Sequence, residues 1–320
     1  MTSSICFIVP YFGKLPNYFQ LWLNSCQRNP NITWFLYIDD KTIYKFPNNV
    51  IVTYSSLSEI KKKVERLYDF KINLKSPYKL TDFKPAYGEI FAEDVSGYDY
   101  WGHCDIDLIF GNIEKILNNP IKNNYDKILT RGHFSLYKNT KDINQLYREG
   151  DRKFREVFST SDFYSFDEWS KGGINDIFVE NGADIYDEIV FSDIYVGSFL
   201  LIPVQKMVTD KIKQNSIFFW SNGNLYRIYK NNNRLCREEV LYVHLQKRKM
   251  FFNYDTNMQN NFLVVPNTFK AMSENIESQT DLGSEFKCNR PYLIYYSNSF
   301  IRVIKRIQGA IQRHYIKLFS

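Results

Sequence analysis

The sequence has no run of about 18 consecutive apolar residues, the length that a helix needs to cross a bilayer. A transmembrane anchor is therefore not expected. The apolar run from Ile5 to Phe12 has no basic residue before it and no small-residue cleavage site after it, so it is not typical of an export signal. We expect a cytoplasmic protein in which this run forms a buried first strand.

Cysteine and histidine are both scarce. The five cysteines have no paired spacing, and an odd number is typical of reduced thiols rather than of a disulfide framework. The cysteines and histidines also lack the spacing of a zinc site. Because there are only four histidines, the surroundings of each one are informative.

Excess charge is absent from most of the chain. The net charge is +6, and residues 290–320 contain six basic residues and no acidic one. The remaining 35 basic residues therefore balance the 35 acidic residues. An enzyme that acts on nucleic acid usually spreads its basic residues over a groove, so no nucleic-acid partner is expected.

The last 31 residues, 290–320, are predicted to form a basic amphipathic helix. Basic residues surround an apolar stripe made by Phe300, Ile304, Ile307, Ile311, Tyr315 and Leu318. Such a helix favours the anionic inner face of the membrane, and the alternative is packing against a second subunit in a homodimer.

The first half of the chain alternates β-rich apolar runs with helical patterns, which predicts an α/β fold with a mostly parallel central sheet. The expected strands there are Ile5–Tyr11, Thr33–Ile38, Val50–Tyr54 and Tyr98–Cys104. Helical spacing recurs at Tyr18–Cys26, at Ile60–Leu67 and at Tyr87–Asp94. Ser56 and Ser58 are the candidate caps of the second of these helices. In the second half, the expected strands are Lys127–Thr130, Val196–Val204 and Val240–Leu245.

Two carboxylates, Asp105 and Asp107, stand where the apolar strand Tyr98–Cys104 ends. Aspartate oxygens are preferred ligands of Mg²⁺ or Mn²⁺, and such ions often bridge protein carboxylates to a substrate diphosphate. Strand ends in parallel sheets are also where ligands bind. The alternative for a lone Asp-x-Asp triplet is a solvated loop.

Three short motifs extend this pattern: Ile8-Val9-Pro10, Ile38-Asp39-Asp40 and Asp105-Ile106-Asp107. Together with the segments Lys79–Gly88 and Gly102–Gly111, they resemble bacterial GT-A glycosyltransferases of capsule, O-antigen and other surface-polysaccharide clusters. The resemblance covers roughly residues 5–250.

The resemblance implies a Rossmann-like GT-A domain over residues 1–289, with a nucleotide-sugar-binding half at 1–130 and an acceptor-side half at 131–289. It assigns Pro10, Tyr11 and either Asp39 or Asp40 to the nucleoside. It assigns Asp105 and Asp107 to the donor diphosphate and to a bound Mn²⁺ or Mg²⁺, with UDP as the commonest nucleotide of such enzymes.

His244 lies near the end of the apolar segment Val240–Leu245 and is the candidate third metal ligand, because an imidazole can complete such a site. Its alternative is a hydrogen-bonded structural histidine. Lys247 and Arg248 follow it and are candidates for the departing diphosphate, or else belong to a solvated basic turn. Lys84 before Pro85 is a candidate contact for phosphate or sugar, or has an architectural role.

Two neighbouring acids, Asp167 and Glu168, are candidates for the catalytic base that takes a proton from the acceptor hydroxyl. The alternative is a helix start with acids at its positive end. Trp169 is a candidate for binding sugar, because sugar rings pack well on aromatic faces. His133 follows the expected strand Lys127–Thr130 and is a candidate for the border of the sugar pocket.

The sequence therefore predicts a metal-dependent hexosyltransferase, peripheral at the inner membrane, that moves a sugar from a UDP-hexose or related donor to a glycan or lipid-linked acceptor. One alternative is a haloacid-dehalogenase-like phosphatase. In that family the Asp-x-Asp motif stands near the first strand, whereas Asp105 and Asp107 follow a later one. A sugar-nucleotide pyrophosphorylase would need a Gly-rich basic loop, to which Pro10–Leu15 is a poor match. A non-enzymatic peripheral membrane scaffold is the remaining alternative.

Overall fold

The computed structural model describes residues 3–150, 153–205, 215–232, 234–252 and 260–272, together with Leu282, Glu285 and Phe286. The predicted tail at 290–320 lies outside the described residues. The chain forms two compact units. The first contains Met1–Phe191, Asn222–Leu225 and Val240–His244, and the second contains Ser192–Ser221, Tyr226–Glu239 and Leu245–Ser320.

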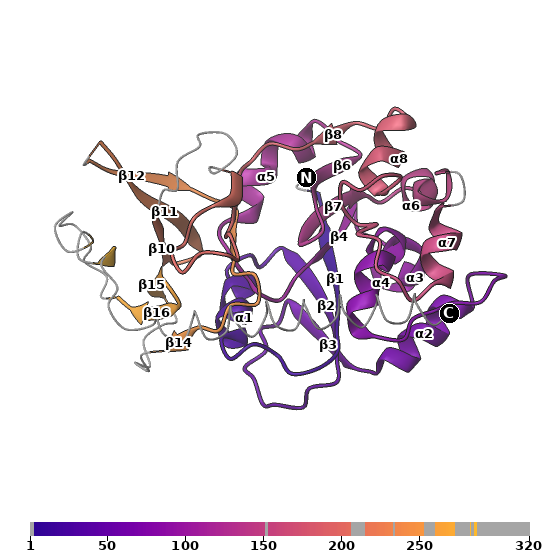
Figure 1. Cartoon of the computed structure of the whole chain (residues 1–320), viewed down its shortest axis with the longest axis horizontal. Coiled ribbons are helices and arrows are strands. Elements are labelled where there is room, and N and C mark those ends of the chain that lie inside the picture. The colour runs from indigo at the N-terminus through magenta and orange to yellow at the C-terminus, as the bar shows by residue number, and fades with distance from the viewer. Residues whose placement is uncertain are drawn as a thin grey trace, which may run out of the picture. The chain divides into compact units, whose positions relative to one another are not determined.

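The first unit is built on a seven-stranded sheet in the order β3-β2-β1-β4-β7-β6-β8 (Figure 1). Strand β1 pairs in parallel with β2 and β4, and β2 pairs in parallel with β3, whereas β7 runs antiparallel between β4 and β6. The predicted α/β architecture with a mostly parallel sheet is therefore confirmed. The strands are β1 Ile5–Tyr11, β2 Ile32–Ile38, β3 Val50–Tyr54, β4 Tyr100–Cys104, β6 Lys127–Arg131, β7 Phe134–Lys138 and β8 Ile185–Tyr186.

Both faces of this sheet are buried, which is why its central strands are almost continuously apolar. On one face, Phe7 of β1 packs in a cluster with Trp22 of α1. On the other face, Ile8 packs in a cluster with Val64 of α2 and Phe83 of η1. Figure 1 shows α1 on one side of the sheet and α2, α3 and α4 on the other. These elements are α1 Phe19–Gln27, α2 Leu57–Glu65, the 3₁₀ segment η1 Pro77–Ala86, α3 Tyr87–Ile90 and α4 Ala92–Val95.

Helix α2 begins at the predicted cap. The Ser56 side chain accepts from the backbone N–H of Glu59, and the Glu59 carboxylate accepts from the backbone N–H of Ser56. The further helical segments of the first unit are α5 Ile113–Lys122, α6 Lys141–Gln145, η2 Leu146–Arg148, α7 Lys153–Ser159 and α8 Ile174–Glu180. Within the described residues, no helix has the length and apolar character of a membrane span.

The second unit contains a sheet in the order β12-β11-β10-β15-β16-β14. Its strands are β10 Ser216–Ser221, β11 Asn224–Asn231, β12 Arg234–Glu239, β14 Phe251–Phe252, β15 Asn261–Val265 and β16 Thr268–Ala271. The compact units divide the chain at other positions than the predicted binding halves, 1–130 and 131–289, which remain predictions of role.

The prediction of a strand at Val196–Val204 was wrong. The segment forms turns with isolated bridges at Pro203 and Leu201, and the guanidinium of Arg248 takes the carbonyls of Tyr195, Ser198 and Phe199. These carbonyls converge on one guanidinium, which favours a turned backbone over an extended strand. The apolar run is therefore a folded loop, although its composition is typical of a strand.

Candidate functional site

The chain order of the main sheet reverses at β1, which has β2 on one side and β4 on the other. In open α/β sheets, ligands bind beyond the carboxyl ends of the strands at such a reversal. Tyr11 ends β1, and Asp105 directly follows β4. Burial raises the pKa of the Tyr11 phenol, and the charges of Asp107 and Asp105 raise it further. The acidic residues thus gather at the edge of the sheet where a ligand is expected.

The backbone of Asp105 is held from two sides. Its N–H donates to the carbonyl of His133 over 3.0 Å, continuing the pairing of β4 with β7. Its carbonyl accepts from the indole Nε1 of Trp22 over 3.2 Å. The start of the Asp-x-Asp segment is therefore fixed in place by residues from α1 and from the turn before β7.

His244 reaches the same place through a separate strand pair. Strand β13, Tyr242–His244, runs antiparallel to β5, Leu108–Phe110, and places His244 opposite Leu108. The Nε2 atom of His244 consequently lies 3.4 Å from Oδ1 of Asp107, and both side chains are buried. The ring of His133 stacks on the ring of His244 with 4.2 Å between centroids.

The ligand atoms of Asp105, Asp107 and His244 all lie within 4.8 Å of one another. Carboxylate oxygens suit Mg²⁺ and Mn²⁺, and an imidazole nitrogen is a good ligand for a borderline transition ion. The donor set therefore fits a divalent cation, with Mn²⁺ favoured over Mg²⁺ by the nitrogen. The structure brings the three predicted ligands together, and their role in binding a metal ion remains a proposal.

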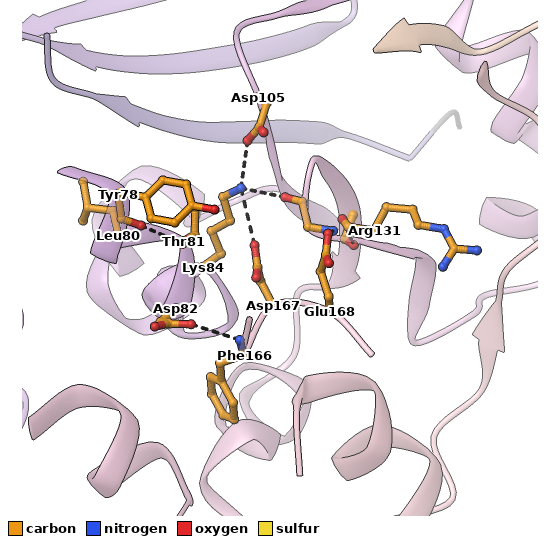
Figure 2. Close-up of polar contacts among 12 residues, drawn as sticks. Tyr78, Leu80, Thr81, Asp82, Lys84, Asp105, Arg131, Phe166, Asp167 and Glu168 are labelled. Carbon is orange, nitrogen blue, oxygen red and sulfur yellow. Dashed lines mark hydrogen bonds and ion pairs between the residues drawn. The ribbon is translucent and has the colours of Figure 1, made fainter. Parts of the chain in front are cut away.

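Lys84 of η1 joins Asp105 to a second carboxylate (Figure 2). Its Nζ lies 2.8 Å from Oδ1 of Asp105, 2.6 Å from the carbonyl of Gly132 and 3.5 Å from Oδ2 of Asp167. Burial disfavours the charged ammonium, but the charges of Asp105 and Asp167 outweigh it and raise the pKa of Lys84. Three oxygens thus occupy three donors. The contact with phosphate or sugar predicted for Lys84 remains a prediction, and the contacts described here are all with protein groups.

Asp167 and Glu168 lie together but in different surroundings. Asp167 is buried, and this burial raises the pKa of its carboxyl to about 7 although Lys84 acts in the opposite direction. Glu168 is exposed, and its Oε1 accepts from the backbone N–H of Gly132 over 3.2 Å. A Cβ on Gly132 would lie 2.6 Å from Oδ2 of Asp167 and 2.8 Å from Cγ of Glu168. A glycine is therefore required for this approach of the two acids.

The segment that carries these acids is anchored by a buried ion pair that the sequence analysis missed. Nζ of Lys79 lies 2.8 Å from Oδ2 of Asp82, and both side chains are almost fully buried. The Asp82 carboxylate accepts from the backbone N–H groups of Tyr164 and Phe166, and Lys79 donates to the carbonyl of Asp162. The usable signal was a Lys and an Asp three residues apart within the Lys79–Gly88 motif.

The acids after β2 support the loop that follows β1. Oδ1 of Asp39 accepts from the N–H of Gly13 over 2.7 Å, and Oδ2 of Asp40 accepts from the N–H of Leu15 over 3.1 Å. Hydrogen bonds from Thr42 and from backbone N–H groups lower the pKa of Asp40. Pro10 lies within β1 beside Tyr37 of β2. The nucleoside-binding roles predicted for Pro10, Tyr11, Asp39 and Asp40 remain predictions.

The remaining predicted residues have mixed placements. Arg248 is buried and donates to three backbone carbonyls and to Oδ1 of Asn267, so it does not belong to a solvated turn, and its predicted contact with the diphosphate remains a prediction. Lys247 is exposed in a turn with positive φ. Trp169 is 49% exposed, and its Nε1 donates to Oγ1 of Thr130 over 3.0 Å. The sugar-binding roles of Trp169 and His133 remain predictions.

Similar solved structures include the galactosyltransferase LgtC in complex with donor and acceptor sugar analogs, the glycosyltransferase GlyE of Streptococcus pneumoniae TIGR4, and mouse xyloside xylosyltransferase 1. LgtC is 9% identical, with 59% of this chain and 74% of LgtC covered and a TM-score of 0.33. GlyE is 13% identical, with 58% of this chain and 46% of GlyE covered and a TM-score of 0.31. The xylosyltransferase is 8% identical, with 76% of this chain and 97% of the xylosyltransferase covered and a TM-score of 0.33.

Scores of this size do not establish a shared function, which must be argued from the site itself. No curated protein matches the sequence. A family profile described as a family of unknown function, DUF6625, matches residues 7–273, most of the length of the chain. The chain belongs to the DUF6625 family.

Proposed function

We propose that the protein is a metal-dependent glycosyltransferase that moves a sugar to a hydroxyl of a glycan or lipid-linked acceptor. The proposed donor is a UDP-hexose. The observation that carries this proposal is the convergence of Asp105, Asp107 and His244 at the reversal of the parallel sheet. Nucleotides bind at such an edge of open α/β sheets, and a divalent ion held by one or two carboxylates commonly contacts the substrate phosphates.

The proposed chemistry is a displacement at the anomeric carbon of the donor. A bond forms from the acceptor oxygen to that carbon, the bond to the diphosphate breaks, and the nucleoside diphosphate leaves with the electron pair. Asp105, Asp107 and His244 would hold a divalent ion, which when bound supplies positive charge for the departing diphosphate. Lys84 positions the carboxylate of Asp105 and sets it at a fixed place relative to Asp167.

The donor is tested by incubating the full chain with UDP-glucose, UDP-galactose or GDP-mannose in the presence of Mn²⁺, Mg²⁺ or EDTA. We expect release of the nucleoside diphosphate with Mn²⁺ and its loss with EDTA. The matching donor should also raise the melting temperature, because it binds the folded state alone. Absence of both effects for every donor would contradict the proposal, and phosphate release from p-nitrophenyl phosphate would favour the phosphatase alternative.

A carboxylate is expected to take the proton of the acceptor hydroxyl. The variants Asp167→Asn and Glu168→Gln identify which of the two acids is this base. The variant that lacks the base should lose turnover by about 10²- to 10⁴-fold while it keeps the donor-induced rise in melting temperature. If Asp167 is the base, wild-type kcat should rise with pH up to about 7 and then level off, because only the ionised carboxylate accepts a proton. Normal rates in both variants would remove these acids from the mechanism.

The setting of the reaction also remains a proposal. A role in capsule or O-antigen synthesis, a cytoplasmic position at the inner membrane and a homodimer all rest on the sequence resemblance and on the tail at 290–320. Vesicle sedimentation of the full chain with anionic and neutral lipids, compared with a chain that ends at residue 289, is the direct measurement. Loss of binding to anionic vesicles on truncation is the expected result.

A further inference from the structure

Two large aromatic side chains of the first unit are in contact with each other and exposed to solvent. Tyr78 is 54% exposed and Phe163 is 43% exposed, and their ring centroids are 4.8 Å apart with 50° between the planes. Aromatic rings usually contribute large apolar areas to the interior of a protein. Exposed apolar surface that gathers in one place is a feature of binding sites.

The pair is held in place by buried groups. Tyr78 is the second residue of η1, and Phe163 stands between Asp162 and Tyr164. Lys79 binds the carbonyl of Asp162, and Asp82 accepts from the N–H of Tyr164, so the buried ion pair clamps both sides of Phe163. The backbone on both sides of Phe163 is therefore held next to η1, which keeps the attachment points of the two rings close together and favours a pre-organised surface.

Tyr78, one ring of the pair, borders the acidic part of the site. Figure 2 shows Tyr78 beside Lys84, on the side opposite Arg131. Burial raises the pKa of the Tyr78 phenol, and the charges of Asp167 and Asp105 raise it further, so the phenol lies within the field of both carboxylates. Any ligand that covers the rings must also satisfy these polar groups.

That combination selects among the ligands that aromatic surfaces bind. An acyl chain or an apolar peptide would offer no hydrogen bond to the exposed carboxylate of Glu168, whose charge also acts on the Tyr78 phenol, and this is unfavourable. A pyranose ring has an apolar face of C–H groups and a rim of hydroxyls. Its face matches the rings, and its rim of hydroxyls matches the exposed carboxylate of Glu168.

We propose that Tyr78 and Phe163 form a platform that binds a pyranose ring of the acceptor. This inference rests on the proposed glycosyltransferase function and narrows the acceptor to one that presents a sugar, rather than a protein or a bare lipid hydroxyl. The platform places a hydroxyl of that sugar toward Asp167 and Glu168.

Saturation-transfer NMR tests the platform with three defined probes: methyl β-D-galactopyranoside, methyl β-D-glucopyranoside and methyl α-D-mannopyranoside. At least one should receive saturation on its C–H protons from the wild-type protein. Tyr78→Ala and Phe163→Ala should each weaken that probe's affinity by about fivefold or more. Phe163→Leu should behave like Phe163→Ala, because leucine keeps apolar bulk but loses the flat face.

Tyr54→Ala is the matched control, since Tyr54 is also 54% exposed and lies on β3, the outermost strand of the sheet and three positions from β4. It should bind the probe as the wild type does. Unchanged melting temperatures would show that all variants fold. The substituted rings are exposed, so a fold defect is not expected.

The platform is overturned if no pyranoside receives saturation from the wild type, or if affinity is the same in all variants. Dimerisation in sedimentation velocity that disappears in Phe163→Ala also overturns it, because the occupant would then be a second copy. Donor hydrolysis by the wild type separates the two proposals. Hydrolysis without pyranoside binding removes only the platform, whereas absent hydrolysis removes the proposed function.

Discussion

Asp107→Asn is expected to abolish metal-dependent turnover while it leaves the fold intact. The amide keeps the shape of the buried side chain beside His244 but removes the charge that would attract a divalent ion. Turnover should fall by at least about 100-fold, the size of effect seen when one group that stabilises developing charge is removed. The rise in melting temperature that Mn²⁺ and donor produce in the wild type should disappear.

The control for this variant is Asp69→Asn, because the Asp69 side chain is 77% exposed and pairs with Arg155 on the surface. It should respond to Mn²⁺ as the wild type does. Isothermal titration of Mn²⁺ in the presence of donor measures the difference directly. Equal Mn²⁺ affinity and turnover in Asp107→Asn and the wild type would show that the cluster is structural and holds no ion.

Lys84→Met is expected to produce the largest loss of stability among the site variants. The substitution leaves the buried carboxyl of Asp167 and that of Asp105 without their shared cation. Breaking a buried ion pair from one side costs about 3–5 kcal/mol. For a chain of this size, the melting temperature at pH 8 should fall by about 4–7 °C. Turnover should fall as well, because Asp105 loses the group that orients it.

The pH dependence of this loss follows from Asp167. Its folded-state pKa of about 7 lies above its value in the unfolded chain, so the carboxyl stabilises the fold when protonated and this contribution is lost as pH rises through 7. Burial disfavours the ionised carboxylate of Asp167, and the variant lacks the positive charge of Lys84 that offsets this cost. The stability deficit of Lys84→Met should therefore be larger at pH 8 than at pH 5, where Asp167 is protonated.

Lys61→Met is the matched control, since Lys61 forms an exposed ion pair with Glu65, 3.4 Å away on α2. Surface pairs of this kind contribute about 0–1 kcal/mol, so its melting temperature should stay close to the wild type at both pH values. A deficit in Lys84→Met that does not depend on pH would contradict the proposed link to Asp167.

The local elements of the first unit were predictable because their signals are periodic and lie within a few residues. The apolar runs Ile5–Tyr11 and Val50–Tyr54 form strands with the predicted bounds, and Ser56 caps α2 through its short-range bond with Glu59. The run Val196–Val204 is also mostly apolar but is a folded loop. Its carbonyls bind Arg248, a partner distant in sequence that no local pattern reveals.

The sequence by itself determined which residues could serve a nucleotide-sugar site, since the acids at strand ends and the late histidine are readable as types and positions. Only the tertiary structure decided which of them meet. His244 reaches Asp107 because β13 pairs with β5, and Lys84 of η1 forms ion pairs with both Asp105 and Asp167. Strand register and buried ion pairs depend on contacts between distant segments, whereas the patterns in a sequence report local periodicity. The same reason left the aromatic pair of Tyr78 and Phe163 unforeseen until the clamp formed by Lys79 and Asp82 was visible.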